Sequence, residues 1–373
     1  MPFIVKNMKT VLNNKSIVYV SGHSPELDPG VDQKVHGLVD TAQKMGFHGI
    51  VLNKYLRTVR SRIRLFKQVF DTDARYIFIR SFGWINLAII PFVIKARWQG
   101  RKVICDQPNS LSCNIKQIKS YKRSSFKRFM SIALTYIHGP FGYMQFNRII
   151  QYDNESQFFS FGVRHKMILM GNGIDADKIM LRKKDYTGNS TLKIVGIATL
   201  KNYHGYDRLI RAIALYNQRS NKKATFYIVG GLESNPVLRD LKQLTVQLGI
   251  EDSVIFYGPR DTDFINELYG MCDVAVDSLC FARIRINICS SLKAREYTLA
   301  GIPFISASND PDFVHDEPFR ITVPNDESIE PLVEVLEDFP NRRKLFTDEQ
   351  IRQFALDNLT YESKLKTMIN GLL

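Results

Sequence analysis

Short apolar runs alternate with longer segments of helical period along the 373-residue chain. Residues 17–20 form a short apolar run, and Val35, Leu38, Val39 and Ala42 then recur at intervals of three and four. The first pattern predicts a buried strand and the second an amphipathic helix. The alternation predicts strands in the first half of the chain at 17–20, 50–52, 76–79, 103–105, 148–150 and 167–169.

The same alternation starts again at residue 193, after a Gly-Asn-Gly-Ile-Asp break at 171–175 and a polar stretch at 182–191. It predicts a second set of strands at 193–198, 226–229, 254–257, 274–276, 304–305 and 320–323. Strands that alternate with helices imply a parallel, doubly wound sheet, so we expect an α/β chain with two Rossmann-like domains facing a cleft. The expected parts are a first domain at 1–172, a linker at 173–192, a second domain at 193–346, and a helical tail at 347–373 that packs back toward the first domain.

The excess of positive over negative charge lies in the first half of the chain. The net charge is +14, and residues 1–170 hold 26 Lys and Arg against 9 Asp and Glu. Two tracts, 54–67 and 116–130, contain no acid, and the second mixes its cations with Tyr121, Phe126, Phe129 and Met130 inside a helical region expected at about 115–137. Such a mixture favours an anionic membrane surface, where each cation contributes about 1 kcal/mol. A solvated charged face is the alternative interpretation of either tract alone.

Cysteine spacing and hydropathy indicate neither a metal-binding protein nor a secreted or membrane-spanning one. The five cysteines form no CxxC pair and have no histidine at zinc spacing, which indicates reduced thiols and no metal site. The Asp-Thr-Asp triplets at 71–73 and 261–263 are interpreted as a loop and a helix cap, so we expect neither a metal nor another cofactor. No signal peptide or membrane-spanning run is evident, and we expect a cytoplasmic protein bound peripherally to the inner face of the membrane.

The stretch 290–305, Ser-Ser-Leu-Lys-Ala-Arg-Glu-Tyr-Thr-Leu-Ala-Gly-Ile-Pro-Phe-Ile, predicts a short helix that two serines open and Gly301 closes. The free backbone N–H groups of its first turn suit a phosphate. Lys293 and Glu296 lie three residues apart and therefore share one face. This pattern suits a diphosphate joined to a sugar diol, while a capped surface helix with an ordinary Lys–Glu pair is the alternative.

Four stretches in order, at 172–175, 200–210, 254–258 and 291–305, resemble the nucleotide-sugar domain of GT-B glycosyltransferases. The resemblance is closest to the retaining family 4 enzymes of bacterial surface-polysaccharide synthesis. It implies that Glu296 accepts hydrogen bonds from the ribose of a nucleotide-sugar donor and that no metal ion is needed. The implied donor-binding residues are Lys201, Arg208, Tyr257, Gly258, Ser290, Ser291, Leu292, Lys293 and Glu296.

The sequence departs from the family pattern at three places. Ile288 stands where the family often has a carboxylate eight positions before the residue that matches Glu296. His204-Gly205 replaces the usual Lys-Gly, which makes Lys201 and Arg208 the candidate phosphate cations. The tripeptide at 283–285 replaces a Gly-rich turn, so contacts made there by the family are not expected here.

Candidate residues of the first domain lie at the predicted ends of its strands. Gly22, His23 and Gly30 belong to the loop after the first strand, which is expected to border the cleft, although an ordinary turn is equally consistent. Asp106 follows the strand at 103–105 and is a candidate base that orients the acceptor, with a turn or cap as its alternative role. His23 and Arg80 are further candidates of the same kind.

The sequence therefore predicts a glycosyltransferase that moves a sugar from a nucleotide diphosphate to a lipid-linked saccharide or polysaccharide, with the retention of configuration that the resemblance implies. A GT-B sugar-nucleotide epimerase is the enzymatic alternative. A nucleic-acid-binding protein would also explain the basic half. No helix-turn-helix, RNA-binding aromatic signature or zinc knuckle is evident, so we expect no nucleic-acid partner.

Overall fold

The computed structural model describes residues 13–26, 29–53, 59–69, 72–81, 83–120, 124–182 and 191–372. The chain forms two compact units. The first unit comprises Met1–Met170 together with Tyr361–Leu373, and the second comprises Gly171–Thr360. The segment expected as a C-terminal tail is thus shared between the units, since its last helix groups with the first unit.

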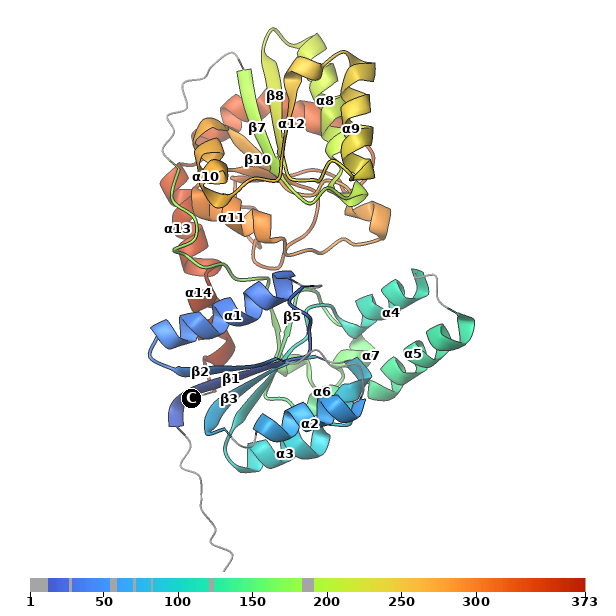
Figure 1. The fold of residues 1–373 in the computed structure, drawn as a ribbon, viewed down its shortest axis with the longest axis vertical. Helices are drawn as coiled ribbons and strands as arrows, with labels where there is room; N and C mark the ends of the chain where they lie inside the picture. The colour runs from blue at the N-terminus through green and yellow to red at the C-terminus, as the bar shows by residue number, and fades with distance from the viewer. Residues whose placement is uncertain are drawn as a thin grey trace, which may run out of the picture. The chain divides into compact units, whose positions relative to one another are not determined.

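A six-stranded, wholly parallel sheet forms the centre of the first unit, in the order β2-β1-β3-β4-β5-β6 (Figure 1). Its strands are β1 (Asn13–Ser21), β2 (His48–Asn53), β3 (Ala74–Arg80), β4 (Lys102–Asp106), β5 (Arg148–Gln151) and β6 (Met167–Leu169). The second unit holds another parallel six-stranded sheet, in the order β12-β11-β10-β7-β8-β9. Its strands are β7 (Thr191–Ile197), β8 (Lys223–Val229), β9 (Val254–Gly258), β10 (Val274–Val276), β11 (Phe304–Ser306) and β12 (Arg320–Thr322). The two sheets confirm the predicted α/β class with two Rossmann-like domains.

Helices cover both faces of the first sheet, because strands buried on both sides present apolar side chains in both directions. Val35 of α1 and Leu365 of α14 pack with Tyr19 on one face, and Leu65 of α2 and Val93 of α3 pack on the other. The helices of this unit are α1 (Pro29–Lys44), α2 (Val59–Val69), α3 (Ile90–Trp98), α4 (Leu111–Ser120), α5 (Ser125–His138), α6 (Phe141–Met144), α7 (Gln157–Ser160) and α14 (Tyr361–Ile369).

The basic region expected as one helical segment at about 115–137 is two helices. Ser124 begins the second of them, since its side chain accepts a hydrogen bond from the backbone N–H of Lys127. A serine in this position favours a helix start over a helix interior. Residues 121–123, and with them Lys122 and Arg123, lie outside the described residues.

The second sheet is likewise covered on both faces. Leu209 of α8 and Leu336 of α12 pack on one side, and Tyr297 of α11 and Ile351 of α13 on the other. The helices are α8 (Tyr206–Arg219), α9 (Pro236–Leu248), α10 (Thr262–Met271), α11 (Leu292–Ala300), α12 (Glu330–Arg342) and α13 (Asp348–Asn358). The Asp261 side chain caps α10 by accepting from the N–H of Phe264, which confirms the predicted cap; Asp71 of the other triplet lies outside the described residues.

Within the described residues, no helix combines the length and apolar character needed to cross a membrane. The same residues contain no group of three or more His, Cys, Asp or Glu side chains with the geometry of a metal site.

Candidate functional site

A pocket of about 920 Å³ opens at the carboxyl ends of β7, β8 and β9 in the second unit. Its volume is that of a site for a nucleotide or cofactor, and ligands of parallel α/β sheets bind at this edge. Lys201 is the one residue of the predicted donor site that lines it. The wall is formed by residues 197–203, 229–232, 234–237, 259–260 and 265.

Two glycines shape the wall where β8 ends. Gly230 and Gly231 have φ values of +104° and +75°, which disfavour any other residue. A Cβ atom on Gly230 would overlap the carbonyl oxygen of Ala198, and one on Gly231 would overlap the side chain of Leu200. The N–H of Gly230 donates to the carbonyl of Gly258 at 2.8 Å, which ties the ends of β8 and β9 together. Backbone alone therefore forms this side of the pocket.

Aromatic and cationic side chains follow β9. Tyr257 does not line the pocket but stacks on Tyr227, with ring centroids 6.1 Å apart. Exposed Arg260 does line it, and its guanidinium lies 5.1 Å from the centre of the Phe264 ring. The sequence interpretation named Tyr257 and Gly258 but not Arg260, although the Gly-Pro-Arg run after the strand was the available signal.

Helix α11 begins as its sequence predicts. The Ser291 side chain accepts a hydrogen bond from the N–H of Ala294, and Gly301 ends the helix with a φ of +77°. The N–H groups of Leu292 and Lys293 have no intrahelical acceptor, and none is found elsewhere among the described residues. These groups and the helix dipole attract an anion.

Ser290 has a different role from Ser291. Its Oγ accepts a hydrogen bond from the N–H of Asn172 at 2.6 Å, and the Asn172 side chain donates to the Ser290 carbonyl at 2.7 Å. The Ser290 hydroxyl is therefore used within the protein, where it fixes the start of α11 to the segment that begins the second unit.

Lys293 supplies a largely buried cation at the start of α11. Its Nζ lies 3.4 Å from Oδ1 of Asp277 and 5.5 Å from the centre of the Tyr206 ring. Burial lowers the pKa of Lys293, and the charge of Asp277 opposes the change. Asp277 itself is buried at the end of β10, and the sequence interpretation missed it because nothing local distinguishes it from other strand-end carboxylates.

Glu296 lies one turn further along α11, and its carboxylate makes no hydrogen bond with any described residue. Burial raises its pKa, and the charge of Lys178 opposes that effect. A half-buried carboxylate without a donor is costly, so its remaining acceptor capacity is available to a ligand. Tyr297, the next residue, accepts from the N–H of Ile197 at 3.2 Å and donates to the carbonyl of Val276 at 3.1 Å. These bonds fix α11 to β7 and to β10, and Ile197 is itself part of the pocket wall.

His204 connects the pocket side of the site with α11. Its Nδ1 accepts the N–H of Lys201 at 2.9 Å, so its proton resides on Nε2. Burial, together with the charges of Lys293 and Lys201, lowers the pKa of His204 to about 3. The residue that replaces the family's lysine is therefore a neutral imidazole between two cations.

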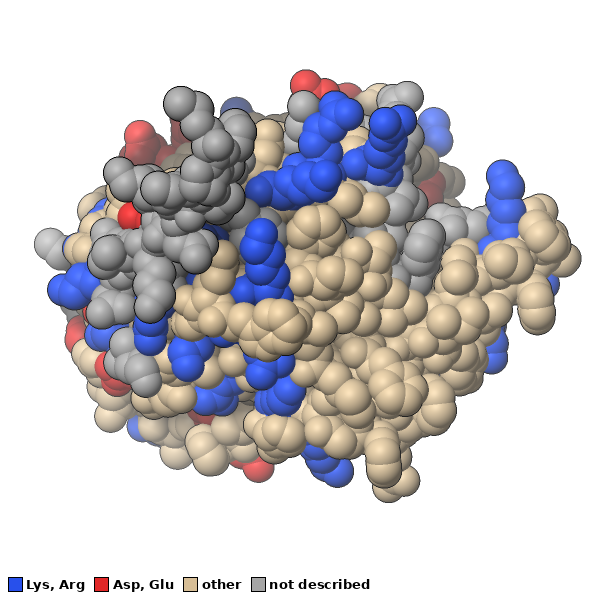
Figure 2. All heavy atoms as spheres, turned by 90° about the horizontal axis from the view of Figure 1, so that it is seen from below, with Lys and Arg blue, Asp and Glu red and all other residues tan. Residues whose placement is uncertain are grey.

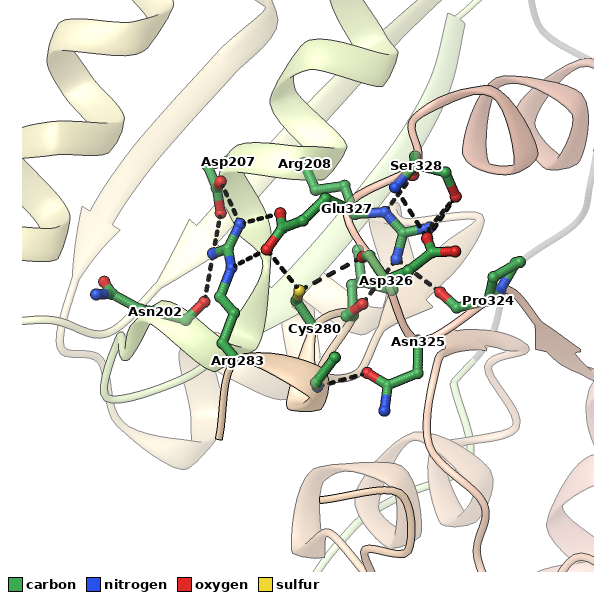
Figure 3. Close-up of polar contacts among 12 residues, drawn as sticks. Asn202, Asp207, Arg208, Cys280, Arg283, Pro324, Asn325, Asp326, Glu327 and Ser328 are labelled. Carbon is green, nitrogen blue, oxygen red and sulfur yellow. Dashed lines mark hydrogen bonds and ion pairs between the residues drawn. The ribbon is translucent and has the colours of Figure 1, made fainter. Parts of the chain in front are cut away.

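Arg208 does not point to the pocket. It is buried and donates to the carbonyls of Leu279 at 2.7 Å and Pro324 at 2.9 Å, and also to that of Ser328 (Figure 3). Its guanidinium therefore holds the loop after β10 against the loop after β12. This geometry differs both from the predicted donor contact and from the alternative of a solvated arginine. The sequence did not indicate it, because the acceptors lie some 70 to 120 residues away along the chain.

Arg283, in the segment that replaces the family's Gly-rich turn, stabilises the same pair of loops that Arg208 connects. It forms ion pairs with Asp207 at 2.8 Å and Glu327 at 2.6 Å and donates to the carbonyl of Asn202 (Figure 3). Cys280 Sγ adds a contact to the Glu327 carboxylate at 3.3 Å. The loop that leads to α11 is thus fixed by charged hydrogen bonds instead of by glycine backbone.

Asp106, the predicted base of the first unit, is fully engaged. It accepts from Lys34 at 2.8 Å and from Arg80 at 2.9 Å, and the Tyr19 hydroxyl donates a further short hydrogen bond. Burial alone would raise the pKa of Asp106, but the charges of Lys34 and Arg80 outweigh it and hold the pKa well below its usual range. Such a carboxylate is a poor proton acceptor, and its geometry is that of a structural ion-pair centre.

The structure also shows where the candidate loop residues of the first unit lie and which contacts they make. His23 is buried, with Nδ1 2.6 Å from the Ser21 hydroxyl and Nε2 3.0 Å from Asp32, so both ring nitrogens have partners. Gly22 follows the end of β1, whereas Gly30 lies in the first turn of α1 instead of in the expected loop.

Lys201 lines the pocket, and His204 accepts the N–H of Lys201. Lys293 and Glu296 lie on α11, the helix that Tyr297 fixes to Ile197 of the pocket wall. The structure separates Arg208 and the Ser290 side chain from these residues. An apolar pocket with cations at its margin, a helix N-terminus and an available carboxylate can bind a flat ring, a phosphate and a diol, respectively.

Comparison with known proteins gives the fold. Residues 179–278 match the family model described as "Glycosyl transferases group 1". A glycosyltransferase from Rickettsia africae superposes with a TM-score of 0.64 at 12% identity, covering 96% of this chain and 100% of that one. Anabaena HepE in complex with UDP and glucose gives 0.56 at 15% identity, with the same coverage. WaaG, a glycosyltransferase involved in lipopolysaccharide biosynthesis, gives 0.59 at 14% identity and covers 95% and 100%. No curated protein sequence matches the chain.

Proposed function

We propose that this chain, which has the GT-B fold of group 1 glycosyltransferases, transfers a sugar from a nucleotide diphosphate and binds that donor on its second unit. The observation that carries the proposal is the Glu296 carboxylate. It is half-buried and has no hydrogen-bond partner among the described residues, one turn beyond a buried lysine at a helix N-terminus. A ribose diol supplies the two donors that such a carboxylate lacks.

The remaining groups fit the other parts of the donor. The pocket beside Gly230 and Gly231 receives the nucleobase, and Arg260 stacks or hydrogen-bonds at its edge. Lys201, Lys293 and the first N–H groups of α11 neutralise the diphosphate as charge develops on the departing oxygens. This set of cations needs no metal ion. HepE, which shares the fold, was solved with UDP, which supports a nucleotide donor here.

The proposal also includes the acceptor, for which we name a chemical class but no individual binding residues. We infer a lipid-linked saccharide or polysaccharide acceptor and retention of configuration, in line with the resemblance to family 4 and with the involvement of WaaG in lipopolysaccharide biosynthesis. The basic tracts 54–67 and 116–130 would hold the chain at an anionic membrane surface on the cytoplasmic side. Lys54, Arg57, Lys122 and Arg123 of these tracts lie outside the described residues, while Lys67, Lys116, Lys119 and Lys127 are exposed.

A thermal-shift panel of UDP-, GDP- and ADP-sugars tests the proposal. We expect one nucleotide series to raise the melting temperature of the wild-type protein in a concentration-dependent manner. Sugar-free diphosphates of the same base should also stabilise it, since the identified contacts are made to the nucleotide. If no nucleotide or nucleotide sugar shifts the melting temperature at millimolar concentration, the proposed donor site is wrong.

A further inference from the structure

Helix α5 of the first unit packs with its apolar stripe turned outward. Phe126, Phe129, Met130, Tyr136 and Ile137 recur at helical spacing and define a stripe about 120° wide. They are exposed, and Phe126, Phe129 and Ile137 keep 74%, 66% and 63% of their accessible surface. The buried residues of the same helix are polar, namely Thr135 and His138. An amphipathic helix normally has the opposite orientation.

The polar side of α5 is specifically satisfied inside the unit. His138 Nδ1 lies 2.9 Å from the carbonyl of Gly139, and Nε2 lies 3.3 Å from the side-chain amide of Asn86. Thr135 donates to the carbonyl of Ser131 at 2.8 Å. The contact between His138 and Asn86 joins the buried side of α5 to a distant segment of the unit, and it is consistent with the observed rotation, in which the aromatic stripe faces outward.

The stripe continues onto α6 and α7. The Tyr136 ring lies 5.9 Å from the ring of exposed Phe158, which starts the continuation onto α7. Phe141, Met144 and Phe161 are also exposed in this part of the chain. Together these side chains expose on the order of 700 Å² of apolar surface, above the roughly 300–600 Å² of the largest patch on a typical monomer. We call Phe126, Phe129, Met130, Tyr136, Ile137, Phe141, Met144, Phe158 and Phe161 the aromatic face.

Lysine side chains border the aromatic face. No Asp or Glu occurs between Asp106 and Asp153 in the sequence. Exposed Lys127 lies beside the stripe on α5, and exposed Lys116 lies on the adjacent helix α4. Figure 2 shows the underside of the molecule with a broad uncharged area, Lys and Arg around it, and few acidic side chains. Exposed apolar residues of the second unit, such as Val246 and Leu345, are instead scattered over separate elements.

We propose that the aromatic face inserts into the interface of an anionic lipid bilayer, so that hydrophobic partition and not charge alone anchors the first unit. This inference deepens the proposed membrane-facing acceptor and rests on the proposed function for its biological purpose. Aromatic side chains with flanking lysines match the headgroup boundary, where rings partition and cations meet anionic lipid. The cations supply attraction over a distance, and the rings supply the part of binding that salt does not screen.

The test is co-sedimentation of the full chain with vesicles of phosphatidylglycerol and phosphatidylcholine at 0.1 M and 1 M NaCl. The wild type should bind, and at 1 M NaCl, where the Debye length is about 3 Å, at least half of the bound fraction should remain. Phe129→Ser/Ile137→Ser should weaken binding about tenfold or more at both salt concentrations. Both side chains are exposed, so the variant should melt at the wild-type temperature.

The matched control is Val246→Ser/Leu345→Ser, which removes two equally exposed apolar side chains from the second unit and should bind as the wild type does. Equal vesicle binding by the aromatic-face variant and the wild type would overturn the inference. Binding that vanishes at 1 M NaCl would also overturn it, because the attachment would then depend only on charge. If the wild type is a dimer that does not bind vesicles, and the aromatic-face variant is a monomer, the face is instead a contact with a second copy of the chain. The nucleotide thermal shift should be the same in all variants, and its absence would count against the donor site instead.

Discussion

Lys293 and Asp277 form a buried ion pair, with Nζ and Oδ1 3.4 Å apart and no hydrogen-bond partner for either atom in the described part of the chain. Because the distance is longer than that of a good charged hydrogen bond, neither charge is fully compensated. A phosphate at the N-terminus of α11 would complete the coordination of the Lys293 ammonium. Under the proposed function, this incompletely compensated ammonium is the group that meets a phosphate of the donor.

Donor binding should take up a proton at alkaline pH. Burial lowers the pKa of Lys293 below its ordinary value of 10.5, and a bound diphosphate raises it again. Since only the ammonium form attracts the phosphate, affinity should fall as pH rises through the lowered pKa of the free protein. Calorimetric titration at pH 9 in buffers of different ionisation enthalpy measures the uptake. Uptake that persists unchanged in Lys293→Met would assign the proton to another group.

Arg208 should matter for stability and not for nucleotide contact. Arg208→Leu leaves the buried carbonyl of Leu279 and the partly buried carbonyls of Pro324 and Ser328 without their donor, which should cost about 3 kcal/mol in the free energy of unfolding by urea. Arg211→Leu removes an exposed arginine from the same helix and should cost less than about 0.5 kcal/mol. A folded Arg208→Leu protein with undiminished stability would contradict the bracing role.

Asp106 should show the pH dependence of a structural carboxylate. The charges of Lys34 and Arg80 hold its pKa in the folded protein below the value of about 3.9 in the unfolded chain. Its stabilisation is therefore present above about pH 4 and is lost as pH falls through the folded pKa. Asp106→Asn should lower the free energy of unfolding by about 3 kcal/mol at pH 7, because it leaves buried Lys34 without its counter-charge.

The stability difference between the wild type and Asp106→Asn should shrink below pH 4, as measured by urea denaturation across pH. The pH profile of transfer should contain no inflection that Asp106→Asn removes. An inflection near neutral pH that disappears in this variant would restore Asp106 as a proton acceptor.

Local patterns predicted the elements well, since period and capping are local properties. Ser291 and Gly301 marked the ends of α11, and the Asp-Thr-Asp triplet at 261–263 marked the start of α10. The side-chain roles were harder to predict. Arg208 binds carbonyls from two distant loops, and Asp106 collects donors from β1, α1 and β3. No spacing in the sequence brings such partners together.

The outward rotation of α5 could not be predicted from the sequence either. Its apolar stripe was evident at 126–130, but periodicity gives the width of a stripe and not the side on which it packs. Only Thr135 and His138, buried on the opposite side, show that the aromatic residues face out. Departures from local expectation are common at functional surfaces, which makes this helix informative.

The central claim, that the second unit binds the donor nucleotide through Glu296, is tested most directly by calorimetry with the diphosphate that stabilises the wild type. Glu296→Gln should bind it about tenfold to a hundredfold more weakly, because charged hydrogen bonds to a ribose diol are lost. Glu267→Gln, an exposed change on α10, is the matched control and should bind normally. Since burial raises the pKa of Glu296, its ionised form destabilises the free protein at neutral pH, and the melting temperature of unliganded Glu296→Gln should be equal to or above that of the wild type. Weakened binding with retained stability is the predicted result, and unchanged affinity in Glu296→Gln would contradict the donor-site assignment.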